Sequence, residues 1–147
     1  MATVFDVAQY ILDRLGQMTT IKLQKLVYYA QAWSLVWDEA PIFDAKIEAW
    51  ANGPVVYSLF QCFQGSYYAS PQAQIGDVGH LTDIQRETVD AVIRDYGQRD
   101  SHWLVELTHL EDPWKQARQR AGALPGQKCN EEITHADMAE YYSGLIS

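Results

Sequence analysis

Apolar side chains recur at steps of three and four residues along most of the chain, which is the period of an α-helix. The longest such stretch runs from Thr20 to about Trp37 and predicts the central helix of a small bundle. An earlier stretch runs to Leu15, with Thr3 as its cap and Asp6 three residues later, where a carboxylate can reach back to free N–H groups. Polar side chains fall on the other face of the long helix, which predicts that this face meets solvent or the rim of a protein interface. They are Lys22, Gln24, Lys25, Gln31 and Ser34.

Five further helices follow, and capping residues or prolines mark where most of them begin. Pro54 suits the first position of one helix, and Pro113 suits the first position of another helix that Asp112 caps. Thr82 and Gln85 have the spacing of a capping box. The five predicted helices cover about residues 54–63, 82–96, 101–110, 113–122 and 134–142.

Three stretches lack the helical period. Residues 45–50 alternate between apolar and polar side chains, which favours a short extended segment. Residues 66–81 and 123–132 are rich in glycine, proline or polar residues and are predicted loops. The pattern therefore predicts an all-α fold, an irregular bundle of about seven helices with room for one short β segment near residues 45–50. The length predicts one domain over residues 1–147.

Charge and composition narrow the class of partner. The chain carries 11 Lys and Arg against 19 Asp and Glu, a net charge of −8 spread along its length without a basic stripe. We therefore expect no nucleic-acid binding by this domain alone, because phosphates need cationic side chains. No run of apolar residues is long enough to span a membrane, and the acidic N-terminal stretch does not resemble a signal peptide. A cytoplasmic location follows, with Cys62 as a buried core thiol, Cys129 as a loop thiol and no disulfide.

Few residues form a pattern that carries chemistry. Histidine and cysteine spacings match no metal site, and no phosphate loop or nucleophile elbow occurs, so we expect no metal and no cofactor. His109 and Glu111 could form an acid–base pair, which would make the chain a small histidine-dependent hydrolase. The alternative, which we favour, is a corner between two helices in which His109 meets free carbonyl groups. The chain is then predicted not to be an enzyme.

The aromatic content is the more informative signal. Five Trp, nine Tyr and four Phe exceed what a core of this size needs, and Trp and Tyr concentrate at binding hot spots. Two adjacent tyrosine pairs and two lysines of the long helix are candidate interface residues. They are Lys22, Lys25, Tyr67, Tyr68, Tyr141 and Tyr142.

Three blocks of sequence resemble the Panacea-domain antitoxin family of SocA-like and GepA-like phage-associated proteins. The first block is residues 22–32 (KLQKLVYYAQA), the second is residues 47–56 (IEAWANGPVV), and the third is the Thr-His and Pro-Trp corner at residues 108–114. They stand in the order expected of the family. The positions that match its motifs are Lys22, Gln24, Lys25, Tyr28, Tyr29, Glu48, Trp50, Asn52, Gly53, Pro54, Thr108, His109, Pro113 and Trp114.

The resemblance implies a cytosolic, mostly helical antitoxin of a type II toxin–antitoxin system that neutralises a cognate protein toxin by binding it directly. A second interpretation is a proteolytic adaptor that delivers a bound partner to a protease, and the sequence does not separate delivery from masking. The resemblance carries over neither the toxin's identity nor an oligomeric state. Blocks two and three are also expected to fix the fold, with Gly53 permitting a turn and Trp50 and Trp114 filling the core.

Overall fold

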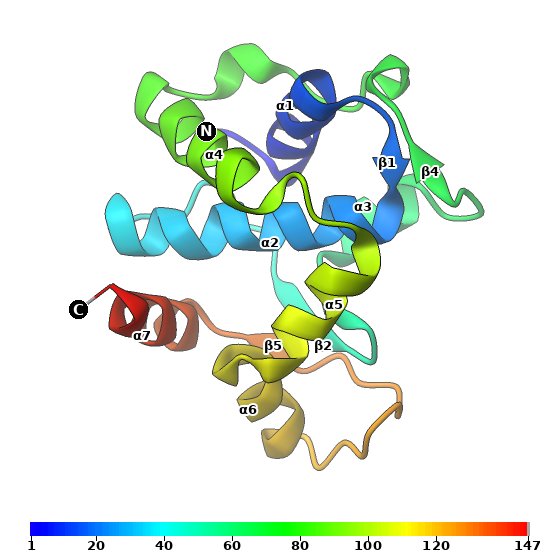
Figure 1. The fold of residues 1–147 in the computed structure, drawn as a ribbon, viewed down its shortest axis with the longest axis vertical. Coiled ribbons are helices and arrows are strands. Elements are labelled where there is room, and N and C mark those ends of the chain that lie inside the picture. The colour runs from blue at the N-terminus through cyan, green and yellow to red at the C-terminus, as the bar shows by residue number, and fades with distance from the viewer. Residues whose placement is uncertain (147) are drawn as a thin grey trace.

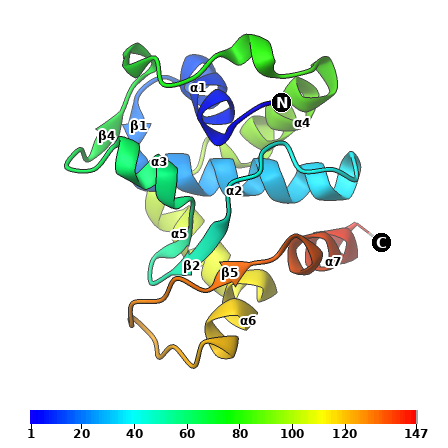
Figure 2. The ribbon, with the colours of Figure 1, turned by 180° about the vertical axis from the view of Figure 1, so that it is seen from behind.

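A long central helix organises the protein, which we describe from a computed structural model covering residues 1–146. Helix α2 crosses the middle of the molecule, with α1 and α4 on one side and α7 on the other (Figure 1, and from behind in Figure 2). The described residues hold seven α-helices: α1 (Val4–Leu15), α2 (Thr20–Trp37), α3 (Tyr57–Cys62), α4 (Asp83–Tyr96), α5 (Ser101–Leu110), α6 (Asp112–Arg120) and α7 (His135–Leu145). The prediction of a mostly helical bundle is confirmed.

Local side-chain chemistry sets where most helices begin. Thr3 and Thr82 each accept a hydrogen bond from the third residue of their helix, whose side chain bonds back in return, so both predicted capping boxes are present. Asp100 and Thr134 cap α5 and α7, and the side chain of each accepts one backbone N–H from the first turn of its helix. Thr19 caps α2. The caps at Thr3 and Thr82 are local in sequence, which is why the pattern alone located them.

The polar face of α2 is buried except at Lys22, which is half-buried, and this corrects the prediction that the face meets solvent. Gln24 donates to the carbonyl of Val56 at 3.1 Å and accepts from the Val56 N–H at 2.9 Å. Gln31 binds the backbone of Phe43 in the same manner. Irregular segments carry backbone groups that no helix or strand satisfies, and buried polar side chains supply the missing partners. The polar face of α2 therefore anchors connecting segments.

Two small antiparallel sheets mean that the fold is not strictly all-α. One pairs β1 (Met18–Thr19) with β4 (Tyr68–Ala69). The other has the order β3 (Gly53–Val55), β2 (Ile47–Trp50), β5 (Glu132–Ile133). The predicted extended segment at 45–50 is thus real, and its partners come from segments for which no strand was predicted.

Two predicted helix starts are wrong. Pro54 lies in β3 opposite Ala49, and α3 begins three residues later at Tyr57. The proline lacks an N–H, and a three-stranded sheet's outer strand tolerates it there. Asp112 is the first residue of α6 and not its cap, while Glu111 holds the cap position without capping. Within the predicted loop at 66–81 lie β4 and two short 3-10 turns, η1 (Pro71–Ala73) and η2 (Val78–His80).

The burial of one cysteine differs from its prediction. Cys62 is exposed at the end of α3, so it is not a core thiol, and Cys129 is half-buried. Both are free thiols. None of the helices within residues 1–146 combines the length and the apolarity needed to cross a membrane.

Candidate functional site

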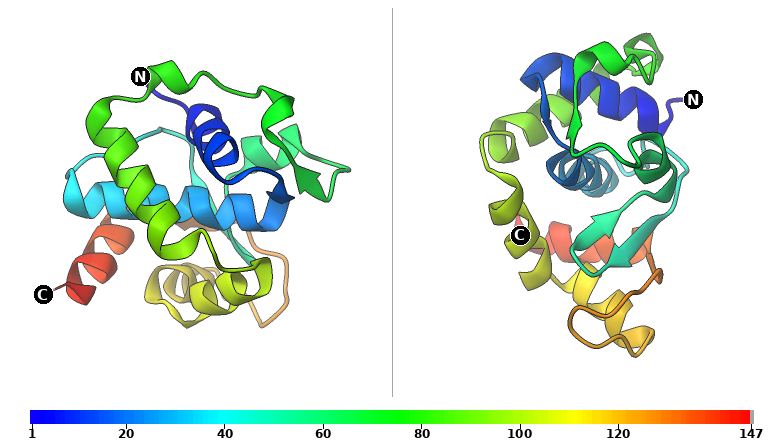
Figure 3. Two further views of the ribbon diagram at one scale, coloured as in Figure 1. Left: turned by 45° about the horizontal axis from the view of Figure 1, so that its top comes forward. Right: turned by 90° about the vertical axis from the view of Figure 1, so that its right-hand side faces the viewer.

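A groove with a volume of about 890 Å³ lies beside the N-terminal half of α2. Its other walls come from the β2–β3 hairpin, from α3 with the turn after it, and from residues 126–130. The right-hand view of Figure 3 shows the hairpin between α3 and the orange segment that contains residues 126–130. About half of the lining side chains are apolar or aromatic and the rest are polar, a mixture that is typical of binding sites.

Three aromatic rings cluster on the rim of this groove, and we call them the rim aromatics: Trp50, Tyr57 and Phe60. The ring of Trp50 lies 4.9 Å from that of Phe60 and 6.2 Å from that of Tyr57. Tyr57 is 49% exposed and Phe60 is 38% exposed, so the cluster faces solvent over much of its area. Trp50 is fixed by a 2.8 Å hydrogen bond from its Nε1 to Glu48. Ordered aromatic surface next to an apolar hollow suits a protein partner.

Lys25 lies in the wall of the groove and is 1% exposed. Its Nζ donates to the carbonyl oxygen of Pro54 at 3.2 Å. Burial lowers the pKa of Lys25 to about 7, because the charged form loses water and gains little in return. The sequence placed this lysine on a solvated face, so its burial is a result of tertiary packing.

Gly53 makes room for Lys25 at the hairpin turn. Its φ of +114° is a conformation that favours glycine, and a Cβ there would lie 2.6 Å from Lys25 Cε and 2.9 Å from Thr108 Oγ1. The first and second blocks of the family motif therefore meet at this point, with the third block's Thr108 alongside.

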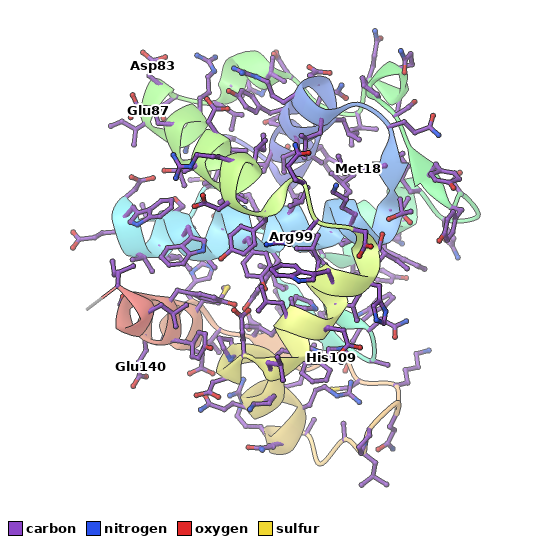
Figure 4. All side chains as sticks on the ribbon, in the orientation of Figure 1. Met18, Asp83, Glu87, Arg99, His109 and Glu140 are labelled. Atoms are coloured by element: carbon purple, nitrogen blue, oxygen red, sulfur yellow. The ribbon has the colours of Figure 1, made fainter. Side chains whose placement is uncertain are left out.

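The third block closes the corner between α5 and α6 against the hairpin. The ring of His109 stacks on Trp114 with centroids 4.0 Å apart, and Trp114 Nε1 donates to the carbonyl of Trp50 at 2.8 Å. Figure 4 labels His109 at the end of α5 next to α6. Burial lowers the pKa of His109, and the charges of Lys25 and Arg118 lower it further. The corner therefore positions the hairpin that forms one wall of the groove.

Glu111 points into the protein's core and binds tyrosines. The hydroxyls of Tyr29 and Tyr142 each donate to Glu111 Oε1 at 2.7 Å, and the hydroxyls of Tyr28 and Tyr142 lie 2.9 Å apart. Burial raises the pKa of Glu111, and the two tyrosine hydrogen bonds offset part of that rise. We call this set the tyrosine–carboxylate cluster. The hypothetical acid–base pair is thus divided, since His109 stacks on Trp114 and Glu111 is held by Tyr29 and Tyr142.

The predicted interface residues lie in different environments. Tyr67 and Tyr68 are 63% and 55% exposed, with their rings 4.9 Å apart beside β1. Tyr142 is fully buried, so the expectation that it is an exposed contact residue is wrong. Tyr141 and Lys22 are half-buried, and Lys22 Nζ donates to the carbonyl of Gly97 at 2.7 Å.

Two of the rim aromatics were missed because the predicted helix at 54–63 assigned that stretch to the core. The pattern placed Phe60 on the buried face of that helix. The available sign of a surface position was Tyr57, a residue with a polar hydroxyl in an otherwise apolar stretch, and the prediction did not use it. Within residues 1–146, no group of three or more His, Cys, Asp or Glu side chains could hold a metal ion.

The motif positions converge in space around the hairpin, and the comparison with known families agrees with this. The family model described as "Antitoxin SocA-like, Panacea domain" matches residues 23–115, which is more than half of the chain. No curated protein and no solved structure gives a significant match. The match covers most of α2, the hairpin and α3, which line the groove, and the α5–α6 corner, which packs against the hairpin. The chain belongs to the family of SocA-like antitoxins with a Panacea domain.

Proposed function

We propose that this antitoxin neutralises a cognate protein toxin by binding it directly, as the protein component of a type II toxin–antitoxin pair, and that the toxin docks on the groove and its rim aromatics. The observation that carries the proposal is the cluster of Trp50, Tyr57 and Phe60 on an apolar groove that the family's motif residues build. In this proposal the chain acts in the cytoplasm as one domain over residues 1–147, and it uses no cofactor, nucleic acid or catalytic step.

Energetic considerations support the groove over other surfaces. Covering half-exposed aromatic rings removes apolar area from water at roughly 25 cal/mol per Å². The rings are held in place by packing and by the Trp50–Glu48 hydrogen bond, so little side-chain freedom is lost on binding. Preorganised aromatic anchors of this kind dominate the affinity of many interfaces.

The net negative charge of the chain favours a positively charged partner. The net charge of −8 raises the encounter rate with a positively charged protein and leaves residence time to the buried contacts. We expect salt to slow association more than it speeds dissociation.

The test uses the protein encoded by the adjacent gene as the toxin. Co-expression with the parent chain is expected to relieve growth arrest, and the two proteins are expected to co-purify. The double variant Y57A/F60A is expected to lose rescue and to weaken binding by at least about 100-fold, as removal of two hot-spot rings would. The exposed Ile84→Ala on α4 is the matched control and is expected to bind like the parent.

Three results would contradict the proposal. The first is absence of a complex at low salt. The second is full rescue by Y57A/F60A, which would show that the toxin binds another surface. Loss of rescue in Y67A/Y68A would then place the binding surface at these two tyrosines. The third is a shorter toxin half-life in the presence of the chain, because masking leaves that half-life unchanged and delivery to a protease shortens it.

A further inference from the structure

We propose that the loop between α6 and β5, residues 121–131, is a preformed wall of the groove that contacts the toxin, and that Arg118 is the residue that positions it. We call this segment the α6–β5 loop. The inference rests on the proposed function, since it adds a contact wall and a positioning residue to the same groove. It is carried by a buried arginine whose guanidinium group joins three backbone carbonyls, two in the loop and one in strand β2.

The α6–β5 loop supplies polar groups to the groove. Figure 2 shows the loop extending from α6 to β5, and its residues that line the groove are Gly126, Lys128, Cys129 and Asn130. Lys128 and Asn130 are exposed and present an ammonium and an amide, whereas the rim aromatics present rings. A partner that leaves such polar groups unpaired on binding loses affinity. The loop therefore adds selectivity to the affinity that the rings supply.

A tight turn at residues 124–127 fixes the backbone of the loop. The N–H of Gln127 donates to the carbonyl of Leu124 at 2.9 Å, and Gln127 Oε1 accepts from the Leu124 N–H at 2.8 Å. Pro125 occupies the second position of the turn, and Gly126, with a φ of +77°, occupies the third. This is the pattern of a type II turn, in which proline sets one dihedral angle and glycine accepts a positive φ. The loop thus has a defined shape without being a helix or a strand.

Arg118 ties this turn to the body of the protein. Its Nη2 donates to the carbonyls of Leu124 at 2.9 Å and of Gln127 at 2.6 Å, and its Nη1 donates to the carbonyl of Ala49 in β2 at 3.0 Å. Arg118 is 4% exposed, and none of the ion pairs formed among residues 1–146 includes it. A planar guanidinium donates in several fixed directions at once, which a lysine ammonium does not reproduce. Both ends of the turn are therefore held against β2, the strand that carries one of the rim aromatics.

Other backbone bonds hold the two ends of the loop. The N–H of Ala123 donates to the carbonyl of Arg118 at 2.9 Å, and the N–H of Ala49 donates to the carbonyl of Glu131 at 2.9 Å. Loss of the guanidinium fork is therefore expected to free the middle of the loop while α6 and β5 stay in place. A loop that is fixed before binding loses little conformational freedom in the complex, and a freed loop must be ordered at the expense of affinity.

The experiment combines calorimetric titration of the adjacent-gene toxin with amide hydrogen exchange of the free and the bound protein. We expect R118K to bind at least about tenfold more weakly than the parent, and amides of residues 124–130 to exchange faster in free R118K. We expect the toxin to slow exchange of the same amides in the parent. The matched control is Arg86→Lys, because Arg86 donates to the carbonyl of Val78, in a loop outside the groove lining. It is expected to change affinity by less than about twofold.

The pattern of exchange separates positioning from general stability. Faster exchange confined to the loop indicates positioning, whereas faster exchange in α2 as well would assign Arg118 to the core and overturn the proposal. A second variant, Q127A, removes the side-chain bond that closes the turn and leaves the buried arginine intact. Gln127 is exposed and lies outside the groove lining, so Q127A is expected to fold like the parent and to bind about threefold more weakly. If R118K did not fold, Q127A would decide.

Parental affinity in R118K despite faster loop exchange would overturn the proposal, because the shape of the loop would then not matter to the toxin. Unchanged loop exchange in R118K would overturn the role of Arg118, and a bound toxin that leaves loop exchange unaltered would overturn the contact. In these cases Y57A/F60A would still weaken binding. Failure of the proposed function is distinct, since the parent itself would then not bind the toxin.

Discussion

Two buried ionisable groups of opposite sign, Lys25 on α2 and Glu111 packed against α2, have different hydrogen-bond partners. Glu111 receives hydroxyl hydrogen bonds from Tyr29 and Tyr142, and Tyr28 extends the cluster. Lys25 reaches a single carbonyl oxygen. Both groups have pKa values shifted toward the neutral form by burial. Only the carboxylate has a set of fixed donors that offsets part of this shift.

The contrast separates a group whose hydrogen bonds join distant segments from one that reaches a single neighbouring turn. The tyrosine–carboxylate cluster joins α2, the start of α6, and α7, segments that are far apart in the chain. Its polar atoms are satisfied within the molecule, so removing one partner leaves others buried and unpaired. Lys25 lies in the wall of the groove but is only 1% exposed, and its Nζ donates to the carbonyl of Pro54. The same chemical situation, a charge out of water, is thus met by several hydroxyl groups in one place and by a single carbonyl in the other.

The largest effect is expected from removing the donors of the cluster. The double variant Y29F/Y142F leaves the carboxylate of Glu111 buried without its two hydroxyl partners and should lower the free energy of unfolding by about 4 kcal/mol. Urea unfolding at pH 7 measures this. E111Q is the control, because its amide oxygen still accepts both hydroxyls, and it should lose about 1 kcal/mol. Equal losses in the two variants would show that the carboxylate charge is unimportant.

The next effect concerns pH and Lys25. The folded-state pKa of about 7 lies below the unfolded value of 10.5, so above pH 7 the unfolded chain retains a proton that the folded protein releases. The parent should therefore gain about 3 kcal/mol of stability, relative to K25M, between pH 7 and pH 9.5, with no further change in this difference below pH 6. Urea midpoints across this range test the sign. A parent that loses stability relative to K25M as the pH rises would contradict the assigned burial.

A smaller effect is expected at the turn beside Lys25. Gly53→Ala places a methyl group 2.6 Å from Lys25 Cε at a φ of +114°, which should lower stability by about 2 kcal/mol. Gly122→Ala is the control, because its φ is also positive, at +68°, and nothing lies within 4 Å of the added atom. The free energy of unfolding of Gly122→Ala should fall by about 1 kcal/mol. Equal effects at both positions would mean that contact with Lys25 adds nothing.

The smallest effect is expected from an ion pair that is not buried. Asp83 lies at the exposed start of α4, labelled in Figure 4, and its carboxylate is 3.1 Å from Arg86. D83N should not shift the urea midpoint measurably, since solvent and salt screen such pairs. A clear shift would show that burial is not what sets Lys25 and Glu111 apart from surface charges.

Much of the fold could be predicted because its causes are local. The caps at Thr3 and Thr82 and the period of residues 20–37 depend on neighbours within one or two helical turns. The alternation at 45–50 likewise indicated β2. The start of α3 was predicted wrongly because its cause is not local. Proline suits both a first helical turn and an outer strand, and pairing with Ala49 in the sheet decided between them.

The candidate site was less predictable, because it depends on which segments meet. The motif blocks contained Lys25, Trp50 and Gly53, yet their spacing gave no sign that a glycine turn would close over a lysine. The exposed rings of Tyr57 and Phe60 depend on α3 beginning after a strand, with its aromatic side turned outward.

By itself the sequence determined the helical class, most helix limits, the acidic surface and the family, since composition, period and motif order are properties of the chain. The tertiary structure alone decided that the polar face of α2 is buried, that Glu111 binds tyrosines and not His109, and that Lys25 borders a groove. The physical reason is that burial and the pairing of charges are set by neighbours dozens of residues away, which local pattern does not encode.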